Sequence, residues 1–123
     1  MSSNAPRVVM YQLDVANREP FDLGHIEHVP HQAGVYIIYD LAGPIYVGRS
    51  RVDINRRLRS HANGTGNKNI ALARRVGAFS SLTFTYCCLP AEEQADVERI
   101  LIASLGVGQF ANLRHEGLYE DDL

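Results

Sequence analysis

The chain has 123 residues, 46% of them hydrophobic, and a formal charge of -2 at pH 7, which fits one globular domain with a modest core. No apolar run is long enough for a membrane helix and no signal peptide is recognisable, so we expect a cytoplasmic protein without a membrane partner. The weakly acidic balance of the whole chain argues against nucleic acid, unless basic residues are concentrated locally.

The first 33 residues form an N-terminal extension, in which Val8 to Leu13 offers one extra edge strand. The segments that follow predict secondary structure much more clearly. Residues 35–40 alternate in a β-type pattern, a turn signal occupies residues 40–44, and residues 44–48 resume the pattern. The sequence therefore predicts a β-hairpin.

The hairpin carries two tyrosines, each close to a glycine. With a three-residue loop at 41–43, Asp40 pairs with Pro44 and Ile38 pairs with Tyr46. Tyr36 then lies diagonally opposite Tyr46 on the same face of the sheet. A loop of two or four residues would shift the register and separate the tyrosines. Two tyrosines arranged in this way either pack as half-buried side chains of the core or form part of a chemical site.

A helix is predicted over residues 53–62, with Asp53 as its N-cap. Arg57 and His61 fall on the apolar stripe of this helix, whereas Arg56 and Arg59 face away. An unpaired charge directed at the protein body is costly. Arg57 and His61 therefore belong either to a structural salt bridge or to a functional site.

A second helix is predicted over residues 68–76 and a third strand over residues 81–88. Between residues 49 and 75 the chain holds eight basic residues against one aspartate, a formal charge of +7. This basic patch is typical of binding to a nucleic-acid backbone, although a protein partner with an acidic surface would also fit.

A long helix follows from Pro90 to about Leu105, with acidic residues in its first turn. Glu98 stands in the middle of its apolar face, where a carboxylate must be paired, bind a metal or be protonated. The chain ends in an acidic tail at 116–123. Together the elements predict an α+β fold, with a small three-stranded mixed or antiparallel sheet flanked by helices.

Five elements in this order resemble the GIY-YIG nuclease domain. They are Gly34-Val35-Tyr36, Tyr46-Val47-Gly48-Arg49-Ser50, Arg57 with His61, Glu98, and Asn112. The resemblance implies a nuclease-like domain at residues 34–115 with a β-β-α-α-β-α order. It also implies a metal-dependent endonuclease that hydrolyses phosphodiester bonds in DNA.

The resemblance also implies a role for each matching residue. Glu98 would hold one Mg²⁺ or Mn²⁺ per active site, with water and phosphate oxygens completing the shell. Arg57 would clamp the scissile phosphate, and Tyr36 would act as general base, assisted by Tyr46 and His61. Gly34, Gly48 and Asn112 would support the site. The expected substrate-binding residues are Arg49, Ser50, Arg51, Arg56, Arg59, Lys68, Arg74 and Arg75.

Other functions remain open on the sequence. A non-catalytic nucleic-acid-binding or partner-binding module would use the same basic patch, but it gives no reason for Glu98 on an apolar face. A nuclease for RNA or single strands would share the whole site. A second copy of the chain and an inhibitory protein are further candidate partners.

Overall fold

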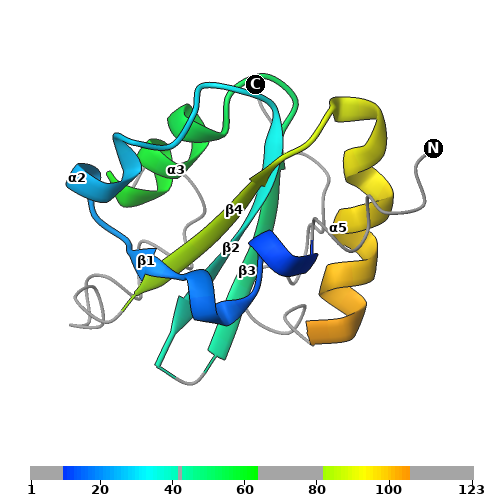
Figure 1. Ribbon diagram of the computed structural model, residues 1–123, viewed down its shortest axis with the longest axis horizontal. Coiled ribbons are helices and arrows are strands. Elements are labelled where there is room, and N and C mark those ends of the chain that lie inside the picture. Colours follow the sequence, from blue (N-terminus) through cyan, green and yellow to red (C-terminus); the bar gives the residue numbers. More distant parts are fainter. Residues whose placement is uncertain (1–9, 42, 64–81, 106–123) are drawn as a thin grey trace.

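The computed structural model describes residues 10–41, 43–63 and 82–105, and the following applies to these residues (Figure 1). Four strands form one sheet in the order β1-β4-β2-β3, and every neighbouring pair is antiparallel. The strands are β1 (Glu19–Pro20), β2 (Gly34–Asp40), β3 (Gly43–Ser50) and β4 (Thr83–Cys88). The helices are the 3-10 helix η1 (Val15–Asn17), α2 (Leu23–Ile26), α3 (Ile54–Ala62) and α5 (Ala91–Leu105).

The α+β fold is confirmed, but the prediction of three strands is wrong. The fourth strand, β1, pairs Glu19 with Phe84 and Pro20 with Thr83 at the sheet edge. It has only two residues, too few for an alternating pattern, and Pro20 is acceptable there because an edge strand can lack a donor. Within the segment expected to supply the edge strand, residues 10–12 are helical instead.

Two other predictions concern helices. The helix expected at 53–62 is α3, and its N-cap is Asp53, whose side chain accepts a hydrogen bond from the Arg56 amide. The helix expected at 68–76 lies outside the described residues.

The hairpin of β2 and β3 differs from the sequence prediction at its turn. Asp40 pairs with Gly43 and Tyr39 with Pro44, so the connection is one residue shorter than expected. A register shift between Ile38 and Tyr39 compensates, and Ile38 still pairs with Tyr46. A β-bulge of this kind places one extra residue in one strand and thereby restores the alternation of faces.

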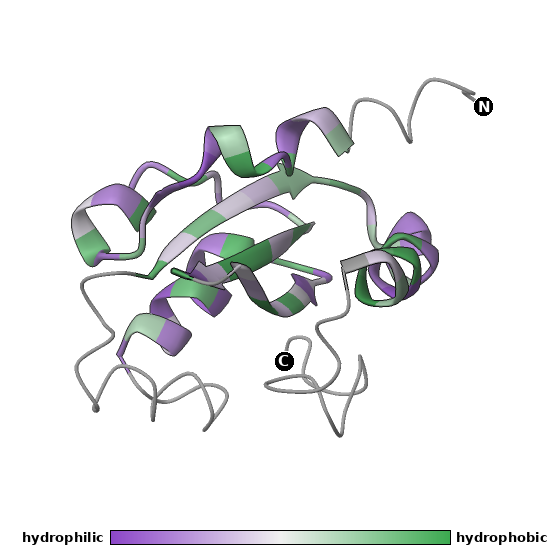
Figure 2. Ribbon diagram, turned by 90° about the horizontal axis from the view of Figure 1, so that it is seen from below, coloured by the Kyte–Doolittle hydropathy of each residue, from purple (hydrophilic) through white to green (hydrophobic). Residues whose placement is uncertain are grey.

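Hydrophobic clusters cover both faces of the sheet. One packs beneath α2 and α3 and includes Tyr36, Tyr46 and Leu58. The other packs against α5 and includes Val35, Val47 and Leu101. Figure 2, which views α5 nearly end-on, shows its hydrophilic residues on the side away from the sheet. Strand β2 is consequently buried on both faces from Gly34 to Tyr39.

The N-terminal segment is fixed to the sheet by buried hydrogen bonds. The Tyr39 hydroxyl donates to the Leu13 carbonyl at 2.9 Å, and the Thr85 hydroxyl donates to the same carbonyl at 3.2 Å. In the part of the chain that the structure describes, no helix has the length and apolarity needed to cross a bilayer.

The two cysteines of β4 lie on opposite faces, as expected for neighbours in a strand. Cys87 is buried in the cluster against α5, while Cys88 packs on the cluster beneath α3. Both are free thiols.

Candidate active site

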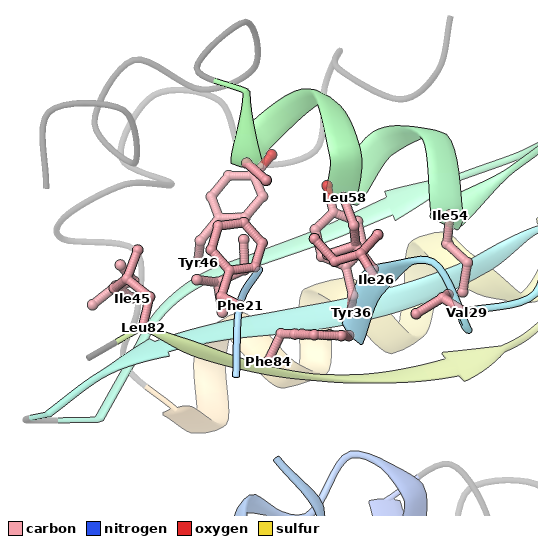
Figure 3. Packing of buried hydrophobic residues seen from close by; sticks show 12 residues of the cluster. Phe21, Ile26, Val29, Tyr36, Ile45, Tyr46, Ile54, Leu58, Leu82 and Phe84 are labelled. Atoms are coloured by element: carbon pink, nitrogen blue, oxygen red, sulfur yellow. The ribbon is translucent and has the colours of Figure 1, made fainter. Parts of the chain in front are cut away.

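The two hairpin tyrosines lie together on one face of the sheet. Strand pairing places Tyr36 opposite Gly48 and Ile38 opposite Tyr46, and the two ring centroids are 6.1 Å apart. In Figure 3 both rings rise from the sheet toward α3. Both are at least 96% buried. The predicted diagonal pair therefore exists, and its rings form part of the core as well.

Gly48 leaves the space in which the two rings meet. A Cβ atom at this position would lie 2.5 Å from Cζ and Oη of Tyr36 and 2.6 Å from Cε2 of Tyr46. No real Cβ makes contacts that short, and two buried rings cannot retreat easily. Gly34 has a comparable role, since its Cβ would lie 2.5 Å from the Cys87 carbonyl oxygen of β4. The glycines next to each tyrosine thus permit close packing.

His61 of α3 completes a cluster of three rings. A buried hydrogen bond of 2.7 Å joins its Nε2 atom to the Tyr36 hydroxyl, and its ring centroid is 5.0 Å from that of Tyr46. Burial lowers the pKa of His61 to about 3, and the positive charge of Arg57 contributes. The imidazole is therefore neutral at pH 7. In the tautomer protonated at Nδ1, Nε2 accepts the hydrogen bond from Tyr36.

An ion pair joins the buried carboxylate of α5 to the hairpin. Glu98 of α5 is only 5% exposed, as its place on the apolar helix face implies, and its Oε1 atom is 3.4 Å from Nε of Arg49. Arg49 belongs to β3 and directly follows Gly48. A buried carboxylate needs such compensation, because desolvation of a charge is costly. Side chains alternate along β3, so this ion pair lies on the α5 face of the strand, whereas Tyr46 lies on the α3 face.

Comparison with known proteins identifies this arrangement. The family model of the GIY-YIG catalytic domain matches residues 32–106, which include both tyrosines, His61 and Glu98. The chain belongs to the GIY-YIG family. No curated protein matches the chain.

Solved structures agree with the family assignment. The chain resembles the GIY-YIG N-terminal endonuclease domain of UvrC from Thermotoga maritima bound to its catalytic divalent cation, magnesium, with 25% identity and a TM-score of 0.54. That match covers 68% of this chain and 88% of the other. A tyrosine-to-phenylalanine point mutant of the same domain, bound to its catalytic divalent cation, matches with 26% identity, a TM-score of 0.53, and coverage of 68% and 87%. The prediction of a GIY-YIG-type endonuclease is thereby confirmed.

The buried carboxylate of Glu98 is a residue that could hold a divalent cation. Among the described residues, no three His, Cys, Asp or Glu side chains come together in one group. Mg²⁺ at phosphate sites is commonly bound through one or two carboxylates, with water and phosphate oxygens as further ligands. A single buried glutamate in the position of Glu98 fits that donor set.

The basic residues that the structure describes differ in their surroundings. Arg51 and Arg56 are exposed, and Arg57 is partly buried. Arg59 donates two hydrogen bonds to Oδ1 of Asn55, from Nε at 3.0 Å and from a terminal nitrogen at 2.6 Å. Its guanidinium is therefore held on the protein. Four residues predicted for the site lie outside the described residues: Lys68, Arg74, Arg75 and Asn112.

Ser50 has an internal role at the end of β3. Its hydroxyl oxygen accepts hydrogen bonds from the amides of Val52 and Asp53, at 3.2 Å and 2.9 Å, and thus shapes the turn into α3. The residue was predicted to bind substrate, and this use of its side chain favours a structural role.

Two buried amides near the site were not singled out in the sequence. Asn55 donates to the carbonyls of Ile26 and Val29 while it holds Arg59, and so joins α3 to the end of α2. Gln94 of α5 is fully buried. In the sequence each of them is a polar residue within the inward apolar stripe of a helix. One polar residue in such a stripe does not change the prediction of an amphipathic helix, so it draws no attention.

A cavity of about 360 Å³ lies on the face of the sheet that packs against α5, opposite the ring cluster. Its lining includes Leu13, Ile37, Tyr39 and Leu101 and is mostly apolar. None of the three clustered rings contributes to it, although Leu101 belongs to the same helix as Glu98.

Proposed function

We propose that the chain hydrolyses phosphodiester bonds in DNA with one Mg²⁺ or Mn²⁺ held by Glu98. The observation that carries the proposal is the burial of this carboxylate beside the hairpin that bears the tyrosine pair. The bound cation would supply charge neutralisation at the phosphate and stabilise the leaving 3′-oxygen.

Tyr36 is the proposed general base for the attacking water. Free tyrosine has a pKa near 10, so the phenol needs a route for its own proton. The 2.7 Å contact with Nε2 of His61 supplies that route, because the neutral imidazole can accept a proton. As the water oxygen bonds to phosphorus, its proton passes to the Tyr36 oxygen while the phenolic proton moves to Nε2. The P–O3′ bond breaks, and the leaving 3′-oxygen takes a proton from solvent water, giving a 5′-phosphate and a 3′-hydroxyl.

Because the pKa of His61 is low, the proton transfer from Tyr36 to His61 depends on the presence of substrate. Proton transfer from Tyr36 to a group with a pKa of about 3 is strongly unfavourable in the free protein. An anionic phosphate close to the ring favours the imidazolium, so the transfer is coupled to substrate binding.

The arginines around the site are proposed to bind the backbone of the substrate. Arg57, next to the ring cluster, would hold the scissile phosphate with its planar guanidinium. Arg51 and Arg56 are exposed and would contact neighbouring phosphates.

Cleavage assays test the proposal against its rivals. The full chain is incubated with plasmid DNA, single-stranded oligonucleotides and RNA, each with Mg²⁺, with Mn²⁺ or with chelator. The proposal expects metal-dependent cleavage of double-stranded DNA. Cleavage restricted to RNA or single strands would change the substrate class, and binding without cleavage of any of them would support a non-catalytic module.

A further inference from the structure

Gln94 occupies the inward face of α5 one turn before Glu98. Its side chain is 0% exposed, and its Nε2 atom donates two hydrogen bonds. One goes to the carbonyl of Ser50 at the end of β3, at 2.9 Å, and the other goes to the carbonyl of Leu89 just before α5, at 2.8 Å. A single amide group thus joins the start of the helix to the end of the strand.

The orientation of this amide is fixed by its partners. Both partners are carbonyl oxygens, so only the NH₂ group can face them. The Oε1 atom finds no donor among the described residues and is buried as well. A buried acceptor without a donor costs free energy, and an apolar residue would avoid that cost. A glutamine at this position is therefore explained by the two bonds that it donates.

The hydrogen bond from Gln94 to Ser50 and the ion pair of Glu98 with Arg49 both connect α5 to β3. Ser50 directly follows Arg49, whose Nε lies 3.4 Å from Oε1 of Glu98. Residues four apart on a helix share a face, so Gln94 and Glu98 both point toward β3. The amide therefore fixes the distance between α5 and β3 at one end, and Glu98 lies one turn further along the same face.

We propose that Gln94 is a positioning residue for the divalent cation, which holds the Glu98 carboxylate at the correct distance from β3. This inference rests on the proposed function, in which Glu98 is the metal ligand. Gln94 itself touches neither metal nor substrate. Its loss is expected to weaken metal binding more than it weakens the fold, because α5 also packs on the sheet through Leu101.

The test compares Gln94→Met with a matched control in the full chain. Methionine has a similar length and no donor, whereas Leu101→Val reduces buried packing of the same helix and leaves both hydrogen bonds of Gln94 in place. Mn²⁺ binding is measured by electron paramagnetic resonance of the free ion, without substrate. Cleavage is measured against Mn²⁺ concentration, and a melting curve is recorded for each variant.

We expect Gln94→Met to weaken Mn²⁺ binding by roughly 10-fold, the lower end of the range for groups that hydrogen-bond a metal ligand directly, because Gln94 acts on Glu98 only through the helix. The rate at saturating Mn²⁺ should recover in large part, and Leu101→Val should bind Mn²⁺ like the wild type. Unchanged Mn²⁺ affinity in Gln94→Met would overturn the inference. Equal weakening in Leu101→Val would overturn it too, because general loosening of α5 would then explain the effect.

Two further variants keep the outcome interpretable. If Gln94→Met does not fold, Gln94→Asn decides, since the shorter amide cannot reach both carbonyls. Wild-type affinity in Gln94→Asn would overturn the inference, and weakened affinity would support it. Glu98→Gln separates the two proposals: if it binds Mn²⁺ like the wild type, the proposed function fails. If it loses Mn²⁺ while Gln94→Met does not, only the role of Gln94 fails.

Discussion

Replacement of Tyr36 by phenylalanine separates a chemical role of this residue from its role in the core. The change removes one oxygen and keeps the buried ring that packs on Tyr46 and His61. It deletes the 2.7 Å hydrogen bond to His61, and loss of one partner of a buried hydrogen bond costs about 1–3 kcal/mol of folding free energy.

The expected effect on catalysis is larger than the effect on stability. Loss of positioned proton transfer lowers a rate by roughly 10²–10⁴-fold. At 1.36 kcal/mol for each factor of ten, this corresponds to about 3–5 kcal/mol in the activation barrier. Tyr46→Phe should lower the rate less, since its phenol would only help to place water or phosphate.

Tyr39→Phe provides the matched control from the same strand. Tyr39 is 3% exposed and lies on the opposite face of the sheet, and its hydroxyl is hydrogen-bonded to the Leu13 carbonyl at 2.9 Å. The variant also loses a buried hydrogen bond, but the Leu13 carbonyl still accepts one from Thr85, so its melting temperature should fall by no more than that of Tyr36→Phe. Its cleavage rate should stay at the wild-type value.

The assay is single-turnover cleavage of plasmid DNA at saturating Mg²⁺, across a range of pH and below the melting temperature of every variant. A wild-type rate for Tyr36→Phe would refute its role as general base. An equal rate loss in Tyr39→Phe would show that lost stability, and not lost chemistry, is responsible.

Three other predictions follow from the site. The pKa of His61 is about 3 in the folded protein and 6.5 in the unfolded chain, so between pH 3 and 6.5 the unfolded chain binds more protons than the folded protein. Urea unfolding should therefore show stability falling as the pH drops below 6.5, by at most about 1.4 kcal/mol per pH unit, with a flatter profile in His61→Gln. Gly48→Ala should cost about 1–3 kcal/mol in urea unfolding and slow cleavage, because its Cβ would clash with both rings, while Gly24→Ala, whose Cβ has ordinary contacts, should do neither. In binding titrations, Arg56→Ala should reduce the salt slope by about one and Arg57→Ala should mainly slow cleavage; equal effects on binding alone would contradict this division.

The hairpin shows how far the sequence determines the site. The alternation of apolar residues fixed which residues share a face, and Tyr36 and Tyr46 do lie together. The turn itself was predicted wrongly, because Gly43 pairs with Asp40 and the register shift occurs beyond it. A shorter turn with a bulge and a longer turn without one give the same face pattern, so hydrophobic periodicity cannot distinguish them.

Other parts of the structure depend on contacts between distant segments. Strand β1 has two residues and gains its identity only from pairing with β4. Asn55 is buried because it meets two carbonyls at the end of α2, which lies nearly thirty residues earlier in the chain. Gln94 is buried for a similar reason at the end of β3. A helical wheel identifies the face of such residues but does not reveal their partners.

The most direct test of the account is DNA cleavage by Glu98→Gln under increasing Mg²⁺. The change keeps the size of this buried side chain and removes its negative charge, so the fold should persist while the anchor for the cation is lost. Glu92→Gln is the matched control, because it removes the same charge from the exposed side of the same helix. The account predicts no detectable cleavage by Glu98→Gln, retained DNA binding and wild-type cleavage by Glu92→Gln. Cleavage by Glu98→Gln at a near wild-type rate would contradict it.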